Sequence, residues 1–226
     1  MPRLLIVTAV AAERAAVLAG RDPATGAVTG QQVHRCQTGA GLVDVGGGGV
    51  GAVSAALSTA ALLAGASYDL VISAGIGGGF AGVELGATVL ADLVVQADLG
   101  AETADGGFSS LTELGMGPVE LEPDPALTGR LADRTGARVG SVLTVATVTG
   151  TAERAQRLQA SYPNALAEAM EGAGVALAAA RAGVPFAEVR TISNRVGPRD
   201  RSSWQLPAAL AALSATFELL LAEPLR

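Results

Sequence analysis

Side chains that commonly do nucleophilic or metal chemistry are scarce in this sequence. His34 is the single histidine and Cys36 the single cysteine among the 226 residues. A Ser-His-Asp arrangement would have to use His34, and one histidine with one cysteine suits neither a zinc site nor a disulfide framework. We therefore expect no metal ion and no cofactor, and we expect both residues to serve packing or the surface.

A first glycine motif raises the possibility of a dinucleotide site. Gly46, Gly48 and Gly51 match G-x-G-x-x-G between an expected strand and an expected helix. Such glycines let the backbone approach a pyrophosphate at a helix N-terminus. The dinucleotide-binding fold that carries this motif also needs an acidic residue at the end of the following strand, whereas Asp69 precedes its strand. In a chain with 30 glycines the match is a weak signal, and a dinucleotide site is disfavoured.

A second glycine run, at residues 73–79, follows the most apolar expected strand, 69–73. Ligands of open α/β sheets bind beyond the carboxyl ends of the strands. Glycines there permit close approach of the backbone to a ligand. We expect this run to be a turn that either only reverses the chain or forms part of a binding site.

The elements that must position these residues alternate along the chain. Apolar runs of strand length are separated by alanine-rich helical stretches, which predicts a largely parallel sheet with helices on both faces. We expect one three-layer α/β domain spanning residues 1–226, with a long loop at 99–125 that is a candidate for function. The expected strands are 4–10, a hairpin within 26–38, 39–45, 69–73, one or two within 86–98, 138–148, 165–170 and 186–193, and the expected helices are 11–19, 52–64, 125–135, 152–160, 171–182 and 207–223.

Composition narrows the class of partner. The formal net charge is −6, and aromatic residues make up 3% of the chain. Nucleic-acid binding favours a basic stripe and stacking aromatics, so neither DNA nor RNA is expected as a partner. No apolar run is long enough for a membrane span. The apolar run in the first residues is too short for a signal peptide, and we expect it to be the first strand. We therefore expect a soluble protein of the cytoplasm that binds a small molecule.

Four segments occur in a familiar order, at residues 8–13, 73–79, 169–172 and 189–194. This ordered set resembles the nucleoside phosphorylase/hydrolase superfamily, and within it the methylthioadenosine/S-adenosylhomocysteine nucleosidases. Among these enzymes the chain looks most like the futalosine hydrolases, which act in menaquinone biosynthesis. The resemblance implies a mixed, partly barrel-like sheet flanked by helices, and a homo-oligomer, dimer or higher, with active sites near subunit contacts. It also implies cleavage of the N-glycosidic bond of a purine nucleoside.

The resemblance also implies roles for matching residues. Glu13 matches the glutamate that orients and deprotonates the attacking water, although an acidic residue in a first helical turn also complements the helix dipole. Glu171 matches the glutamate that binds ribose hydroxyls, since a carboxylate can accept from two vicinal hydroxyls at once. Met170 matches a methionine packed on the sugar. Further substrate contacts are expected from Gly77 and Gly78 of the second glycine run and from the backbone at Val148.

Departures from the nucleosidase pattern point to a different base. Ala169 and Ile76 stand where a glutamate and a serine are usual, and an aromatic residue is missing near Thr147. Asn194 stands where the adenine nucleosidases have an aspartate. A 6-oxopurine presents acceptors at N7 and O6, and an amide has two N–H donors for that pair. Asn194 therefore favours hypoxanthine over adenine and stabilises the charge that develops on the leaving purine.

Water is favoured over phosphate as the nucleophile. An anionic Glu13 at the nucleophile position repels phosphate, and its neighbour Arg14 points away because adjacent helix residues diverge. A hydrolase is therefore expected. A purine nucleoside phosphorylase and a methylthioadenosine-type nucleosidase are the enzyme alternatives, and a non-catalytic nucleotide-binding module is the alternative from another class.

A cluster of arginines suggests a lid. Arg195, Arg199 and Arg201 crowd one short segment that continues to Trp204. Futalosine carries a benzoate, which a guanidinium fork would suit, and Trp204 would cover the sugar side. Phe108, in the long loop, is a candidate apolar wall. The alternative for the arginines is an ordinary solvated loop.

Overall fold

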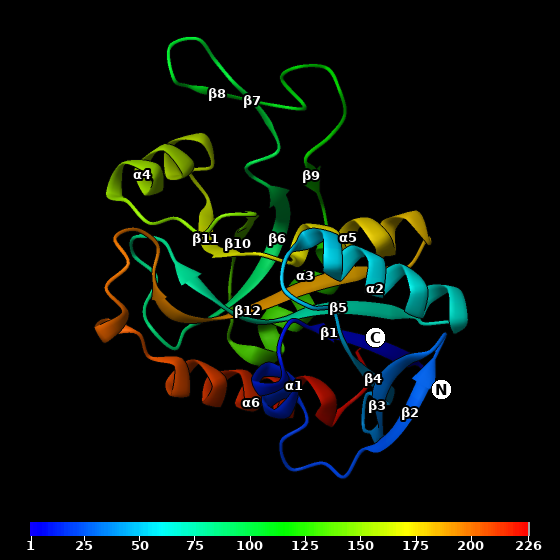
Figure 1. Ribbon diagram of the computed structural model, residues 1–226. Helices are drawn as coiled ribbons and strands as arrows, with labels where there is room; N and C mark the ends of the chain where they lie inside the picture. Colours follow the sequence, from blue (N-terminus) through cyan, green and yellow to red (C-terminus); the bar gives the residue numbers. More distant parts are fainter. Residues whose placement is uncertain (226) are drawn as a thin grey trace.

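The computed structural model describes residues 1–225, in which helices cover both faces of a large sheet (Figure 1). Apolar β-branched runs form its buried strands, and alanine-rich stretches form its helices. The strands are β1 (Arg3–Thr8), β2 (Ala24–Val28), β3 (Gln31–Thr38), β4 (Gly41–Gly47), β5 (Leu70–Gly79), β6 (Thr88–Gln96), β7 (Gly100–Glu102), β8 (Phe108–Ser110), β9 (Glu120–Leu121), β10 (Arg138–Thr144), β11 (Ala165–Ala169) and β12 (Phe186–Arg195). The helices are α1 (Ala11–Val17), α2 (Ala52–Gly65), α3 (Pro125–Thr135), α4 (Ala152–Ser161), α5 (Gly172–Arg181), α6 (Leu206–Ala222) and the short 3₁₀ helix η1 (Arg201–Ser203).

The main sheet is mixed and partly closed. Its strand order is β11-β10-β6-β12-β5-β1-β4-β3-β2, with β9 beside β6 and a further pairing of β11 with β5. That last pairing closes β5, β11, β10, β6 and β12 into a barrel. The partly barrel-like mixed sheet implied by the resemblance is confirmed. The expectation of a largely parallel sheet is wrong for this part of the fold, because β12 pairs with β6, and β11 with β5, in antiparallel fashion.

The second glycine run is part of a strand, so the expected turn is wrong. It forms the carboxyl half of β5, which pairs with β12 on one side and with β11 on the other. A Cβ at Gly77 would lie 2.8 Å from the Glu168 carbonyl oxygen, and one at Gly79 would lie 2.7 Å from Ile192 Cγ2. The glycines therefore let three strands approach closely enough to close the barrel.

The helices form two outer layers. Helices α2 and α5 pack over one face of the sheet, where Leu62 and Val175 are buried in a shared core. Helices α1, α3 and α6 cover the other face, where Phe217 of α6 packs with Val17 and Leu131. The expected three layers are therefore present. Within residues 1–225 no helix is both long and apolar enough to cross a membrane.

The long loop at 99–125 has more structure than expected. It contains the hairpin β7–β8, and β9 adds to the edge of β6. In Figure 1 the hairpin projects from the top of the molecule, away from the helical layers. Phe108 on this hairpin is 46% exposed, and Met116 beyond it is 71% exposed.

Candidate active site

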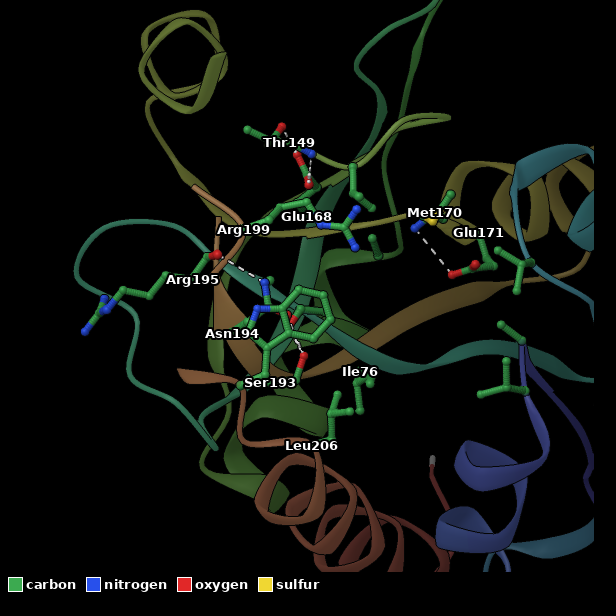
Figure 2. Close-up of a pocket in the computed structure, with 18 of the residues that line it drawn as sticks. Ile76, Thr149, Glu168, Met170, Glu171, Ser193, Asn194, Arg195, Arg199 and Leu206 are labelled. Carbon is green, nitrogen blue, oxygen red and sulfur yellow. Dashed lines mark hydrogen bonds between the residues drawn. The ribbon is translucent and has the colours of Figure 1, made fainter. Parts of the chain in front are cut away.

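A cavity of about 340 Å³ opens at the carboxyl ends of β1, β5, β11 and β12. This is the end of a sheet at which α/β proteins commonly bind ligands. The structure brings together there most of the substrate-contact candidates singled out in the sequence, and Phe108 and Arg201 lie outside the lining (Figure 2). The cavity-lining members of that set are Glu13, Gly77, Gly78, Val148, Met170, Glu171, Asn194, Arg195, Arg199 and Trp204.

Phe108 lies far from this lining. It lies on the projecting β7–β8 hairpin and does not line the cavity of its own chain. The sequence places it in a long loop but cannot say where that loop goes, because a loop's path depends on contacts with the rest of the fold.

Glu13 sits at the start of α1 and faces the cavity while 3% exposed. One carboxylate oxygen accepts the backbone N–H groups of Ala9 and Val10 at 2.9 and 3.2 Å, and the other accepts the Ile76 N–H at 3.0 Å. The carboxylate therefore caps its own helix. It is also tied to β5, which fixes its direction toward the cavity.

Glu171 stands at the start of α5 and is held from three sides. One oxygen accepts the Gly51 N–H at 3.2 Å, and the other accepts the Met170 N–H at 3.3 Å and lies 3.4 Å from Arg190 Nη1. Gly51, the last glycine of the first motif, thus donates its N–H to a carboxylate of the cavity. Asp69, which the dinucleotide alternative needed, lies at the opposite end of β5 and accepts the Arg3 N–H at 2.7 Å.

Asn194 is oriented by its neighbours on β12. The Ser193 hydroxyl lies 2.7 Å from Asn194 Oδ1, and Nδ2 donates to the Arg195 carbonyl oxygen at 3.0 Å. An amide nitrogen has two hydrogens, so one N–H remains for a ligand. In this arrangement one N–H of Asn194 rather than both is free to meet a base.

A buried ion-pair cluster, not anticipated from the sequence, lies under the cavity floor. Arg190 and Glu188 are each 1% exposed, with Arg190 Nε donating to Glu188 Oε1 at 2.9 Å and Nη2 donating to Ser73 Oγ at 2.9 Å. Burial opposes the charge on Arg190, but Glu188, Glu171 and Glu13 together raise its pKa above that of a free arginine. Burial raises the pKa of Glu188. The available signal was a charged pair at i and i+2 in an otherwise apolar strand, which places both on one face.

Gly75 is the point on β5 where this cluster meets Glu13. A Cβ there would contact Glu13 Oε1 and would lie 2.7 Å from Arg190 Nη1. The missing side chain therefore lets the base candidate and the buried guanidinium converge over the strand. Arg190 also pairs with Glu171, so one cation lies between the two carboxylates of the cavity.

Glu168 on β11 was also missed in the sequence. It lines the cavity at 5% exposure and accepts both the backbone N–H of Thr149, at 2.8 Å, and the Thr149 hydroxyl. Burial raises the pKa of Glu168, and the bonds from Thr149 act in the opposite direction. The same loop is also held at Ala146, ahead of Thr149, where Asp98 accepts the Ala146 N–H at 2.7 Å. Asp98 pairs with Arg154 at 3.5 Å as well.

The three arginines of the expected lid lie at different positions relative to the cavity. The Arg199 guanidinium lies over the Trp204 ring at 5.6 Å, and both residues line the cavity. Arg201 stacks on the same ring at 5.7 Å but does not line the cavity. The Arg195 side chain extends away from the centre of the site in Figure 2. Arg199 is therefore the arginine best placed to meet a ligand.

The sequence matches the phosphorylase superfamily over residues 4–222, so the chain belongs to that superfamily. Futalosine hydrolase from Streptomyces coelicolor is 53% identical over 220 residues, which cover 93% of this chain and 92% of that protein. The chain therefore belongs to the futalosine hydrolase family.

Solved structures agree on the fold. Futalosine hydrolase of Helicobacter pylori superposes with a TM-score of 0.81 at 20% identity, covering 98% of this chain and 96% of that one. The 5′-methylthioadenosine/S-adenosylhomocysteine nucleosidase of Helicobacter pylori gives a TM-score of 0.82 at 20% identity, with coverages of 97% and 96%.

Proposed function

We propose that the protein hydrolyses the N-glycosidic bond of futalosine, releasing hypoxanthine and dehypoxanthine futalosine in menaquinone biosynthesis. The family relationship supports both the reaction and the base, and Asn194 in the cavity offers a donor to the leaving purine. We place the enzyme in the cytoplasm, in keeping with a chain whose single cysteine does not suit a disulfide framework.

The observation that carries hydrolysis is the negative charge around the nucleophile position. Three carboxylates, those of Glu13, Glu171 and Glu188, act on the Arg190 guanidinium. Arg190 already donates to Glu188 and Ser73, so it has little capacity left for a phosphate. A surplus of carboxylates repels an anionic nucleophile and leaves water as the favoured one.

The geometry suggests how each group acts. Glu13 holds a water against C1′ and takes its proton as general base. Glu171 accepts the ribose hydroxyls and so fixes C1′ relative to that water. As the bond to N9 lengthens, the free N–H of Asn194 stabilises the charge that develops at N7 of the leaving purine. No covalent intermediate is required.

A chromatographic comparison of substrates tests the proposed function. Purified enzyme would be incubated separately with futalosine, inosine and methylthioadenosine. We expect futalosine to be cleaved with the highest kcat/KM, with hypoxanthine as the released base. Preferential release of adenine from methylthioadenosine would instead support the second candidate, an adenine nucleosidase, which the single free N–H of Asn194 would also suit because N7 accepts in both purines.

Replacing Glu171 with alanine tests the sugar contact. Because ribose contacts position C1′, the variant should lose kcat/KM by about 10²-fold or more. In this variant a 2′,3′-dideoxy analogue should be cleaved with a kcat/KM close to that of the full substrate, since the hydroxyl contact is already gone. Losses that simply add would show that Glu171 does not bind these hydroxyls.

Arg199→Ala tests the carboxylate contact, with Arg201→Ala as the matched control because both arginines stack on Trp204. A charge-assisted bond to the benzoate predicts a loss of about 10- to 100-fold in kcat/KM for futalosine in Arg199→Ala. The loss should be much smaller for an analogue that lacks the carboxylate. Equal losses on both compounds would leave Arg199 as a residue of an ordinary solvated loop.

We also propose a homo-oligomer in which Phe108 reaches a neighbouring site. The projecting hairpin exposes Phe108, and the adjoining segment exposes Met116. Exposed apolar side chains of this kind often mark contact surfaces. Phe108 would then form the apolar wall across a subunit contact.

A further inference from the structure

The base specificity of this site requires a second polar group besides Asn194. With one N–H engaged by the Arg195 carbonyl oxygen, Asn194 has one N–H left to donate. N7 is an acceptor in both hypoxanthine and adenine, so a bond to N7 alone does not separate the two bases. The two purines differ on the side that carries C6 and N1, and another residue must read that side.

The barrel places Glu168 opposite Asn194 across Gly78. In the strand register, Gly78 of β5 is paired with Asn194 of β12 and with Glu168 of β11. Residues paired in this way point to the same face of a sheet, and all three line the cavity. A Cβ at Gly78 would lie 3.2 Å from Asn194 Nδ2, which shows that the amide lies over this glycine.

The space between the two side chains suits a purine. Neighbouring strands lie about 4.8 Å apart, so the Cα atoms of Asn194 and Glu168 are separated by roughly 10 Å. Gly78 has no side chain, which leaves room beside it for Asn194 Nδ2 and Val196 Cγ2, at 3.2 and 3.0 Å from the position of a Cβ. A flat base that enters the cavity beside the Asn194 amide can therefore reach toward Glu168, with a hydrogen bond at each edge.

The Glu168 carboxylate can only accept from a base. One oxygen accepts the Thr149 N–H and the other accepts the Thr149 hydroxyl, which fixes the plane of the carboxylate. Each oxygen retains a further lone pair. Hypoxanthine in a nucleoside has one ring N–H donor, at N1, whereas N1 of adenine is an acceptor. At 5% exposure, water is poorly placed to relieve a mismatch between two acceptors.

We propose that Glu168 selects the base by accepting the N1–H of a 6-oxopurine whose N7 lies at Asn194. The inference rests on the proposed function and adds to it a residue that determines substrate specificity. Glu168 reads the edge by which hypoxanthine and adenine differ, and Asn194 serves the nitrogen at which charge develops.

A purely structural role is the competing explanation, because Glu168 also anchors the loop at Thr149. Asp98 supplies a matched control, since it anchors the same loop through the Ala146 N–H. Asp98 is absent from the cavity lining. Asp98→Asn should therefore loosen the loop while every side chain that faces the base is kept. It also removes a neighbouring charge that raises the pKa of Glu168, so Glu168 stays an acceptor.

Glu168→Gln is the informative variant. Its amide oxygen can still accept the Thr149 N–H, and its NH₂ group can donate to the Thr149 hydroxyl oxygen while presenting an N–H to the base. We expect kcat/KM for the hypoxanthine nucleoside to fall by about 10- to 100-fold. The ratio of kcat/KM for the 6-amino counterpart to kcat/KM for the hypoxanthine nucleoside should rise by at least as much. Asp98→Asn should change both substrates by the same factor.

Binding of the free bases provides a readout apart from turnover. In titration calorimetry, wild-type enzyme should bind hypoxanthine at least about 10-fold more tightly than 1-methylhypoxanthine, which lacks the N1–H. Glu168→Gln should lose that difference. Equal binding of the two bases by the wild type, or an unchanged preference in Glu168→Gln, would overturn the assignment. Equal binding of the two bases by the wild type would overturn the assignment even if the variant does not fold. Failure of the wild type to release hypoxanthine from futalosine would instead contradict the proposed function itself.

Discussion

Glu13→Gln should reduce kcat for futalosine by about 10²–10⁴-fold, the usual contribution of a general base. Glutamine keeps the size of the side chain, and its carbonyl oxygen can still accept an N–H from the start of α1 or from Ile76. The amide is not basic enough to take a proton from water. Single-turnover kinetics at neutral pH would measure the loss of the chemical step.

Substrate binding separates this role from a structural one. Calorimetry with Glu13→Gln should show affinity for futalosine close to that of the wild type, since Glu171, Asn194 and Arg199 are unchanged. A variant that retains near-normal kcat would show that Glu13 is not the base. A variant that loses binding and thermal stability together would show that its capping of α1 is the main contribution.

Asn194→Asp should change which base the enzyme prefers. Aspartate can donate to N7 only when it is protonated, so the hypoxanthine nucleoside should be cleaved more slowly. A protonated aspartate can also accept from the 6-amine of adenine. A change of one or two hydrogen bonds predicts a shift of about 10–10³-fold in the ratio of kcat/KM values for inosine-type and adenosine-type substrates.

The control for this prediction is the double variant with Glu168→Gln. If each residue reads a separate edge of the base, both substitutions should favour adenine and their effects on the ratio should approximately add. An unchanged ratio in Asn194→Asp would mean that this residue does not distinguish the two bases. The preference for hypoxanthine would then depend on Glu168 and on the backbone at Val148.

Local sequence patterns predicted the elements well wherever a single period decided the outcome. Helix α3 lies at the predicted residues 125–135, because Asp124 caps it, accepting the Leu127 N–H at 2.7 Å, and Gly136 ends it in the left-handed region. Strand β1 ends two residues before the predicted boundary. The backbone of Ala9 and Val10 bonds to Glu13 instead of continuing a ladder.

Features that depend on pairing between distant strands were harder to predict. Glycines at 75 and 77–79 are typical of a turn, but here they lie within β5 because β11 and β12 approach from both sides. No local signal in residues 73–79 reports which strands will lie beside them. The antiparallel pairings that close the barrel were missed for the same reason.

Much of the candidate site was predictable because the resemblance placed Glu13, Met170, Glu171 and Asn194 in order. The structure brings all four to one cavity. The ion-pair partner Glu188 and the cavity-lining Glu168 were not predicted. The i, i+2 spacing of Glu188 and Arg190 was the available signal for the first, whereas Glu168 is recognisable only once its neighbours are known. Phe108 was placed in the right loop, but that loop leads away from the cavity of its own chain.

The central claim is that water, rather than phosphate, attacks C1′. It is tested most directly by the mass of the sugar product formed from futalosine in buffers with and without inorganic phosphate. The account predicts the same sugar product in both buffers, dehypoxanthine futalosine with a hydroxyl at C1′, formed at the same rate. A sugar 1-phosphate that forms only when phosphate is present would contradict it.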